Sequence, residues 1–187
     1  IAISDDLGAS ATDFLTSDST LALRGFAEPG AVVEVQLAGQ VRRALADDVD
    51  GAFVVSFEDL GLTDGSYPVQ VLAYDLAGNR SARAATATIR IDTGAPTLSV
   101  NRLETDTGSS SNDYITSDTS PTLIGTAEAG AVIVARLGGV DFCAPVTTDS
   151  RGGWILPLGT VGSGTYNLDI IATDPAGNST KSSIVLV

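Results

Sequence analysis

The chain has 187 residues and a formal net charge of −13, and it contains one cysteine, no histidine and no methionine. Its excess of carboxylates disfavours nucleic acid and anionic membrane surfaces as partners, because both would repel it. Without histidine, acid–base chemistry and zinc sites that use imidazole are excluded, and a lone cysteine cannot form an internal disulfide. No apolar stretch of membrane-spanning length is visible, so we expect no membrane insertion.

Only 5% of the residues are aromatic, while 43% are hydrophobic and 20 are glycine. Val, Ile, Thr and Ala dominate, with Gly and Asp between short apolar runs. β-branched side chains suit a pleated sheet, and Gly and Asp form turns. No long segment carries a helical stripe of apolar residues. The composition therefore predicts an all-β chain.

The second half of the chain repeats the first at an offset close to 100 residues. The sequence Asp-Phe-Leu-Thr-Ser-Asp at 13–18 returns as Asp-Tyr-Ile-Thr-Ser-Asp at 113–118. Two further segments, 25–32 and 74–79, return at 125–132 and 173–178. A period of this length corresponds to a whole domain, and the Gly-Ala-Pro sequence at 94–96 ends one strand before the next begins. We expect two homologous domains, 1–91 and 92–187.

Alternation of apolar and polar residues places the strands of each repeat in chain order. The inward sets expected for the first repeat are Val33, Val35 and Leu37, then Phe53, Val55 and Phe57, then Tyr67, Val69, Val71 and Ala73. The matching sets of the second repeat are Ile133, Ala135 and Leu137, then Trp154, Leu156 and Leu158, then Tyr166, Leu168, Ile170 and Ala172. About seven short strands per repeat predict an immunoglobulin-like Greek-key β-sandwich.

Three single residues have predicted roles in this fold. Tyr67 and Tyr166 each begin the penultimate strand, where such sandwiches often have a tyrosine corner. Trp154 could stack on a sugar, but its alternation with Leu156 favours a place in the core. Cys143 has no partner and is expected to be a small buried hydrophobic residue rather than a reactive thiol.

The ordered motifs resemble the bacterial Ig-like repeats of giant surface adhesins. They comprise 113–118, Gly-Thr-Ala-Glu-Ala-Gly at 125–130, Gly-Trp at 153–154, Gly-Thr-Tyr at 164–166 and Asp-Pro-Ala-Gly-Asn at 174–178. The first repeat departs from the pattern at Leu21, where the second has Pro121. The resemblance implies an extracellular stalk of many such domains, found in biofilm and host-cell adhesins, many of RTX type and exported by type I secretion. It also implies Ca²⁺ at the domain junctions, neighbouring repeats as partners, and a monomer.

The carboxylates cluster in loops that successive antiparallel strands place at two opposite ends of each sandwich. One end is expected to hold Glu28, Asp75 and the acidic turn at 47–50 in the first repeat. In the second repeat the same end is expected to hold Glu128, Asp149 and Asp174, joined by Asp92 of the linker. Carboxylates that lie close together either bind a cation or titrate at raised pKa values, and Ca²⁺ prefers such oxygen ligands. The alternative is that these side chains are solvated turn residues.

The long first loop of each repeat is a second candidate calcium site at the other end of the sandwich. Its carboxylates are Asp6, Asp13 and Asp18 in the first repeat and Asp106, Asp113 and Asp118 in the second. The competing interpretation is that these side chains bind only their own turn backbone.

The sequence predicts a structural module rather than an enzyme, because no insertion interrupts either repeat to form a cleft. An alternative function is recognition of a glycan or host protein by exposed loops. The repeats differ mainly at 39–43 and 138–142, and neither segment has the aromatic content of a binding platform.

Overall fold

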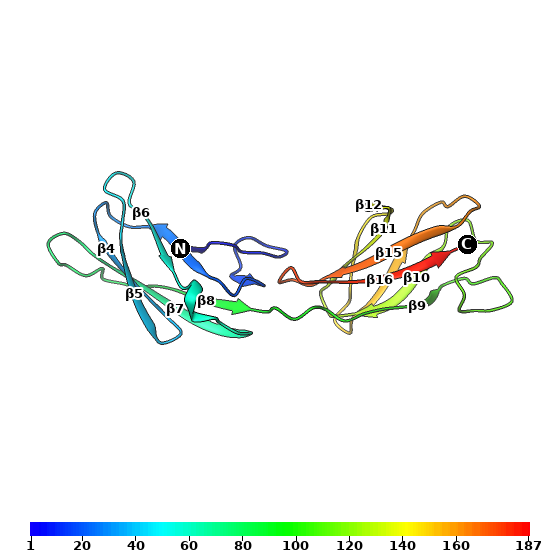
Figure 1. Cartoon of the computed structure of the whole chain (residues 1–187), viewed down its shortest axis with the longest axis horizontal. Coiled ribbons are helices and arrows are strands. Elements are labelled where there is room, and N and C mark those ends of the chain that lie inside the picture. Colours follow the sequence, from blue (N-terminus) through cyan, green and yellow to red (C-terminus); the bar gives the residue numbers. More distant parts are fainter. The chain divides into compact units, whose positions relative to one another are not determined.

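The computed structural model describes residues 1–187 and divides into two compact units, Ile1–Gly94 and Ala95–Val187. Each unit is an all-β sandwich with its own hydrophobic core, which confirms the predicted fold class (Figure 1). The only helical element is a short 3-10 helix in the first unit. No helix has the length and hydrophobicity needed to cross a bilayer.

In the first unit, a three-stranded sheet of order β1-β3-β6 faces a five-stranded sheet of order β2-β8-β7-β4-β5. Strand β2 pairs in parallel with β8, whereas all the other pairs are antiparallel. The elements are β1 (Ala2–Ile3), β2 (Leu15–Thr16), β3 (Ala22–Phe26), β4 (Val32–Leu37), β5 (Gln40–Leu45), β6 (Ala52–Ser56), the helix η1 (Glu58–Leu60), β7 (Gly65–Tyr74) and β8 (Ala85–Ile91).

The second unit repeats this plan with sheets of order β9-β10-β14 and β12-β11-β15-β16, and β13 also pairs with β11. Its strands are β9 (Leu98–Leu103), β10 (Thr122–Ala127), β11 (Val132–Leu137), β12 (Val140–Asp141), β13 (Val146–Thr147), β14 (Gly153–Pro157), β15 (Tyr166–Thr173) and β16 (Ser179–Leu186). The Thr116 amide donates to the carbonyl of Val187, and the Val187 amide donates to the carbonyl of Tyr114. The first loop of the second unit therefore pairs with the end of the chain, as β2 pairs with β8 in the first unit.

The predicted inward faces form the two cores. Trp154 is 3% exposed and packs in the core of the second unit, as alternation with Leu156 indicated. Two residues are exceptions: Ala73 is half-buried and lies outside the core, and Leu137 is 38% exposed although its counterpart Leu37 is fully buried. Leu137 pairs with β12 and β15 just as Leu37 pairs with β5 and β7, so strand pairing does not explain this difference. Cys143 is half-buried against the core, and burial raises the pKa of its thiol.

Both units contain the predicted tyrosine corner. The Tyr67 hydroxyl donates to the carbonyl of Thr63 at 2.7 Å, and the Tyr166 hydroxyl donates to the carbonyl of Gly162 at 3.1 Å. Each bond spans the connection that leads into the penultimate strand. It fixes the path by which the chain crosses from one sheet to the other.

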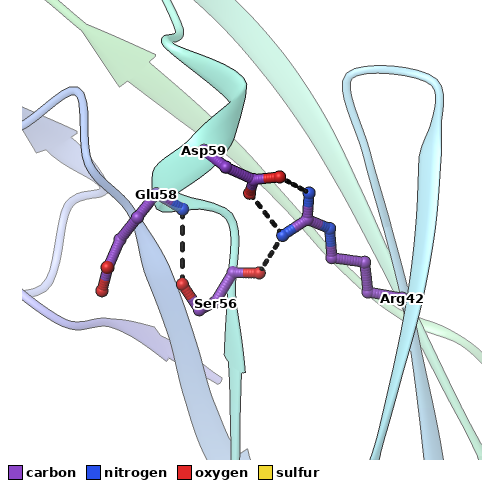
Figure 2. Close-up of polar contacts among 4 residues, drawn as sticks. All are labelled: Arg42, Ser56, Glu58 and Asp59. Carbon is purple, nitrogen blue, oxygen red and sulfur yellow. Dashed lines mark hydrogen bonds and ion pairs between the residues drawn. The ribbon is translucent and has the colours of Figure 1, made fainter.

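One brace is present in the first unit alone. The guanidinium of Arg42 on β5 contacts both carboxylate oxygens of Asp59 in η1, at 2.6 and 2.8 Å, and also donates to the carbonyl of Ser56 (Figure 2). The guanidinium also lies 4.9 Å from the centre of the buried Phe57 ring. A planar guanidinium can bind a carboxylate with two bonds and stack on a ring at once. Arg42 therefore ties the edge of the larger sheet to the end of β6.

A glycine faces an aromatic ring across the smaller sheet of each unit. Gly25 pairs with Phe53, and Gly125 pairs with Trp154. A Cβ atom at position 125 would overlap both the indole ring and the backbone carbonyl of Ser99, whereas a Cβ at position 25 would meet only the Phe53 ring edge, at 2.9 Å. Glycine at position 125 therefore leaves the space that the indole occupies.

We predict that Gly125→Ala destabilises the second unit by about 3 kcal/mol, because overpacking against rigid backbone cannot relax. The matched variant Gly25→Ala should cost about 1 kcal/mol in the first unit, since a ring edge can shift. Trp154 is the only tryptophan, so its fluorescence during urea unfolding reports the second unit, and far-UV circular dichroism reports both. Equal costs for the two variants would contradict this explanation.

Candidate functional site

The acidic turns predicted to share one end of each sandwich do lie together. In the first unit, a Cβ atom on Gly30 would lie 3.3 Å from Asp48 and 3.6 Å from Leu76, which places the three turns side by side. In the second unit, the Thr148 hydroxyl donates to the carbonyl of Glu128 at 2.7 Å, and Gly130 lies next to Pro175. The carboxylates of Glu28 and Glu128 are on exposed residues of these turns.

Most of the other carboxylates at this end bind their own turns. Asp75 accepts the Asn79 amide at 2.8 Å and its side-chain amide at 2.7 Å, and these bonds hold the pKa of Asp75 below its usual range. Asp174, only 3% exposed, is bound in the same way by Asn178. Asp149 accepts the amides of Arg151 and Gly153, both at 2.8 Å. Both oxygens of Asp75 and Asp174 and one oxygen of Asp149 already have donors, which a cation would have to displace.

The first loop of each unit is organised by a threonine hydroxyl. Thr16 is fully buried, and its hydroxyl donates to the carbonyl of Asp5 at 2.8 Å and accepts the Asp18 amide at 3.0 Å. Thr116 makes the same two bonds, to Thr105 and from Asp118, at 3.0 Å each. The sequence interpretation did not assign this threonine a role. The signal was present, because the residue returns at the repeat offset inside the Thr-Ser-Asp motif.

Backbone conformation also distinguishes this loop. Phe14 and Tyr114 have φ angles of 62° and 60°, a left-handed conformation that bulky side chains rarely adopt. The carbonyl of Phe14 accepts the amide of Arg90 on β8, and that of Tyr114 accepts the amide of Val187. The strained residue thus turns its carbonyl toward the last strand of its own unit. Such strain persists only where the surrounding bonds hold it.

Several carboxylate oxygens of the first loops are buried and have no hydrogen-bond partner. They are Oδ1 of Asp6, Oδ2 of Asp18, and both carboxylate oxygens of Asp106. A buried carboxylate oxygen without a donor is costly, and a bound cation is one way to satisfy it. The second oxygens of Asp6 and Asp18 accept the amides of Phe14 and Thr20, at 3.3 and 2.7 Å.

The remaining first-loop aspartates are turn residues. Asp13 and Asp113 are exposed and accept the amides of Leu15 and Ile115. Asp118 accepts the amide of Ser120 at 2.9 Å. For Asp13 and Asp113, the turn-backbone interpretation describes the contacts seen.

Asp92 lies at the first-loop end of the first unit. Its amide donates to the carbonyl of Thr16 at 3.0 Å, which continues the pairing of β2 with β8. Its carboxylate accepts the amide of Gly94 at 3.1 Å. The residue that the sequence interpretation grouped with Glu128, Asp149 and Asp174 is therefore bonded within the first unit to the loop of Asp6 and Asp18.

No three acidic or thiol side chains of the chain come close enough together to hold a metal ion as a preformed cluster. The structure brings Asp6, Asp18 and Asp92 to one loop region. In the second unit, it places Glu128, Asp149 and Asp174 in a different group of turns. Any cation at the first loop would need carbonyl oxygens or water to complete its shell.

Two consecutive sandwiches with the same strand order, the same tyrosine corner and the same turns define a tandem pair of immunoglobulin-like modules. The profile of the bacterial Ig-like domain family matches residues 1–93 and again 95–187. The chain belongs to this family, as two tandem copies. None of the curated protein sequences compared with the chain matches it.

Among solved structures, the fibronectin(III)-like modules of CbhA from Clostridium thermocellum resemble the chain with a TM-score of 0.58 and 12% identity. That likeness covers 99% of this chain and 92% of the other, and it concerns the fold alone. A 1.5-MDa bacterial ice-binding adhesin has a TM-score of 0.41 and 20% identity over all of this chain. A Ca²⁺-stabilized adhesin of an Antarctic bacterium has a TM-score of 0.39 and 21% identity over 91% of this chain. The chain spans 63% and 44% of the lengths of these two adhesin structures.

The bonded turn carboxylates predict a loss of stability in acid. A carboxylate whose pKa is lowered by folding stabilises the protein above its unfolded pKa, about 3.9 for aspartate, and this contribution is lost as the pH falls through the lowered value. Asp75 is such a group, because Asn79 bonds its charged form. We predict that Asp75→Asn destabilises the first unit at pH 6 and that its difference from the wild type shrinks toward pH 2.5.

Asp48→Asn is the matched control, because Asp48 is exposed and accepts no hydrogen bond, yet its replacement removes the same charge. Circular dichroism during urea unfolding at each pH measures both differences. Two outcomes would be contrary: a loss of unfolding free energy in Asp75→Asn that is the same at every pH down to 2.5, or a loss equal to that in Asp48→Asn. Either result would show that the turn bonds are not the source of acid sensitivity.

Proposed function

We propose that the chain is a structural extender, a part of the stalk by which a large bacterial surface protein holds a distal binding domain away from the cell for adhesion or biofilm formation. Its partners are neighbouring Ig-like repeats of the same polypeptide, and it acts outside the cell as a monomer without catalysis. Membership of the bacterial Ig-like family in two consecutive copies supports this role. Export by a type I route remains a prediction from the resemblance to RTX adhesins.

The observation that carries the proposal is how little of the connecting chain is free. Thr93 donates both its amide and its hydroxyl to Asp64 of the first unit, at 2.8 Å each. Pro96 is buried, and the carbonyl of Thr97 already accepts the Glu128 amide of the second unit at 3.3 Å. We infer that these bonds leave few free dihedral angles in the linker and so stiffen it, which a stalk requires.

We further propose that Ca²⁺ stiffens this connection. The unpartnered oxygens of Asp6 and Asp18 fit a hard cation, and the loop that carries them is bonded to the backbone of Asp92. Ca²⁺ takes six to eight oxygen ligands at about 2.3–2.6 Å, and carbonyls and water can supply the rest. A cation there would hold the first loop against the start of the linker. The group of Asp92, Glu128, Asp149 and Asp174 stays a second prediction, although hydrogen bonds already engage both oxygens of Asp174 and one oxygen of Asp149.

We predict that the chain binds Ca²⁺ with a Kd on the order of 10⁻⁴–10⁻³ M, as extracellular modules do. Replacing both Asp6 and Asp18 by Asn should remove a site, because the charge at the unpartnered oxygens is lost. Isothermal titration calorimetry of metal-stripped protein measures both. Asp13→Asn is the control, because Asp13 is exposed and binds its own turn.

The absence of any calcium uptake at several millimolar Ca²⁺ would contradict the calcium proposal. Loss of binding in Asp149→Asn with Asp174→Asn, but not in the first-loop variant, would move the site to the other acidic end.

We predict that Ca²⁺ narrows the distance distribution of the chain in small-angle X-ray scattering and increases its maximum dimension relative to chelator. The reason is that restraint of the linker removes bent conformations from the ensemble. The Asp6→Asn, Asp18→Asn double variant should give one distribution under both conditions. Identical distributions for the wild type with and without Ca²⁺ would remove the stiffening role and leave the extender role without a metal.

A further inference from the structure

Strand β5 is the outer edge of the larger sheet in the first unit. It pairs with β4 along its whole length, from Gln40 to Leu45, and no strand lies on its other side. In the second unit the same edge is formed by β12 and β13, which also have no strand beyond them. This edge is therefore a feature of the fold in the middle of each repeat.

The two units build this edge differently. In the second unit it is interrupted at 142–145, where Phe142 and Cys143 pack against the core and Pro145 lacks an N–H group. The edge there consists of two pieces of 2 residues each. In the first unit it is one continuous strand of 6 residues. Short and interrupted edges discourage pairing with another strand, whereas a continuous edge permits it.

The hairpin between β4 and β5 determines which backbone groups of this edge are free. Leu37 and Gln40 flank its two-residue turn, so they exchange backbone hydrogen bonds, and every second pair after them does the same. The amide of Ala46, which donates to the carbonyl of Ala31, continues this series. The N–H and C=O groups of the residues between those pairs point away from β4. These residues are Val41, Arg43 and Leu45.

The side chains of the same three residues form one stripe on the outer face of the sheet. Val41 is 53% exposed and Leu45 is 71% exposed, and Arg43 lies between them. The guanidinium of Arg43 donates Nε and Nη2 to Oε2 of Glu34, at 2.9 and 2.6 Å, which leaves Nη1 available. A strand added at this edge would place apolar side chains beside Val41 and Leu45 and an acidic one beside Arg43.

A second copy of β5 does not fit this stripe. The antiparallel register that pairs all three residues puts Arg43 of one copy opposite Arg43 of the other, and like charges directly opposite destabilise a strand pair. A run of several acidic residues is also disfavoured, because the chain has a net charge of −13. The stripe therefore favours a strand with a single carboxylate between two apolar side chains.

We propose that β5 is a strand-acceptor site for an extended segment of another protein, whose outward side chains are apolar, acidic and apolar at alternate positions. The segment pairs antiparallel with Val41, Arg43 and Leu45, and its carboxylate binds Nη1 of Arg43. Main-chain hydrogen bonds supply affinity and the stripe supplies selectivity. The proposal depends neither on calcium nor on the stalk function.

The test is a titration of the ¹⁵N-labelled full chain with the capped peptide Thr-Val-Thr-Glu-Thr-Val-Thr. We expect saturable shifts of the amide signals of Val41, Arg43 and Leu45, with a Kd on the order of 1 mM. The exchange of these amides should slow by about tenfold at saturation, because their outward N–H groups gain hydrogen bonds. The signals of 140–147 should stay in place, because that edge is interrupted.

Two control peptides separate strand pairing from charge attraction and from hydrophobic contact. A peptide with Lys in place of Glu should bind about fivefold more weakly, because its ammonium meets Arg43 as a like charge. A peptide with Pro in place of the first Val keeps an apolar side chain but lacks an N–H group, so it should show no saturable binding.

Two protein variants test the role of Arg43. Glu34→Gln removes the carboxylate that competes for the guanidinium, so the Glu peptide should bind about threefold more tightly. Arg43→Gln should weaken binding of the Glu peptide by about fivefold and abolish the difference between the Glu and Lys peptides. The side chain of Arg43 is 66% exposed, so its replacement leaves the core intact.

The proposal fails if no saturable shift appears at about 5 mM peptide, or if the proline or the Lys peptide binds as well as the Glu peptide. It also fails if the amides of Val41, Arg43 and Leu45 are protected without peptide while sedimentation shows a concentration-dependent dimer. That result would show that a second copy covers the edge.

Discussion

The competition for carboxylate oxygens governs what the loops of this chain can do. An aspartate after a strand satisfies amides of its own turn, as Asp75 and Asp174 do through the asparagine four residues later. An oxygen used in this way holds the turn and is not free for a cation. In the first loops, a threonine hydroxyl accepts the Asp18 or Asp118 amide, from the buried Thr16 in the first unit and the half-buried Thr116 in the second. In the first unit, Thr20 donates both its amide and its hydroxyl to one oxygen of Asp18, and the other oxygen has no donor. Aspartate therefore stabilises the turns at one end of the sandwich and is a candidate metal ligand in the first loop at the other end.

The fold was predictable because the strands alternate with a period of two and the repeat confirms each assignment independently. Trp154 illustrates this, since its place in the core followed from Leu156 and from the match to Phe53. The exposure of Leu137 was not predictable, because both its alternation and its strand pairing match those of the buried Leu37. The position of Asp92 needed the parallel pairing of β2 with β8, and a two-residue strand such as Leu15–Thr16 leaves no periodic signal. Local pattern determines which face a residue takes, whereas partner strands determine what lies beside it.

The two repeats keep the same framework but stabilise their edges differently. The first unit uses the contact of Arg42 with Asp59 and the Phe57 ring. In the second unit the tilted pair of Phe142 and Tyr166 rings, with centres 5.9 Å apart, lies next to the short strand β12. The first contact is a charged and stacked group, and the second is apolar packing. Modules in series need a shared path for the chain, and their edges are free to diverge.

The linker also belongs to the second sandwich, because strand β9 begins at Leu98, directly after the hydrogen bond from Glu128 to Thr97. On the other side, Asp64 holds Thr93 by two bonds, and these bonds lower the pKa of that carboxyl group. Protonation of Asp64 in acid would therefore weaken its bonds to Thr93, whereas the backbone bond from Asp92 to Thr16 does not depend on that carboxylate. A metal at the first loop would act on that same short segment, by restraining the backbone that Thr16 and Asp92 already share.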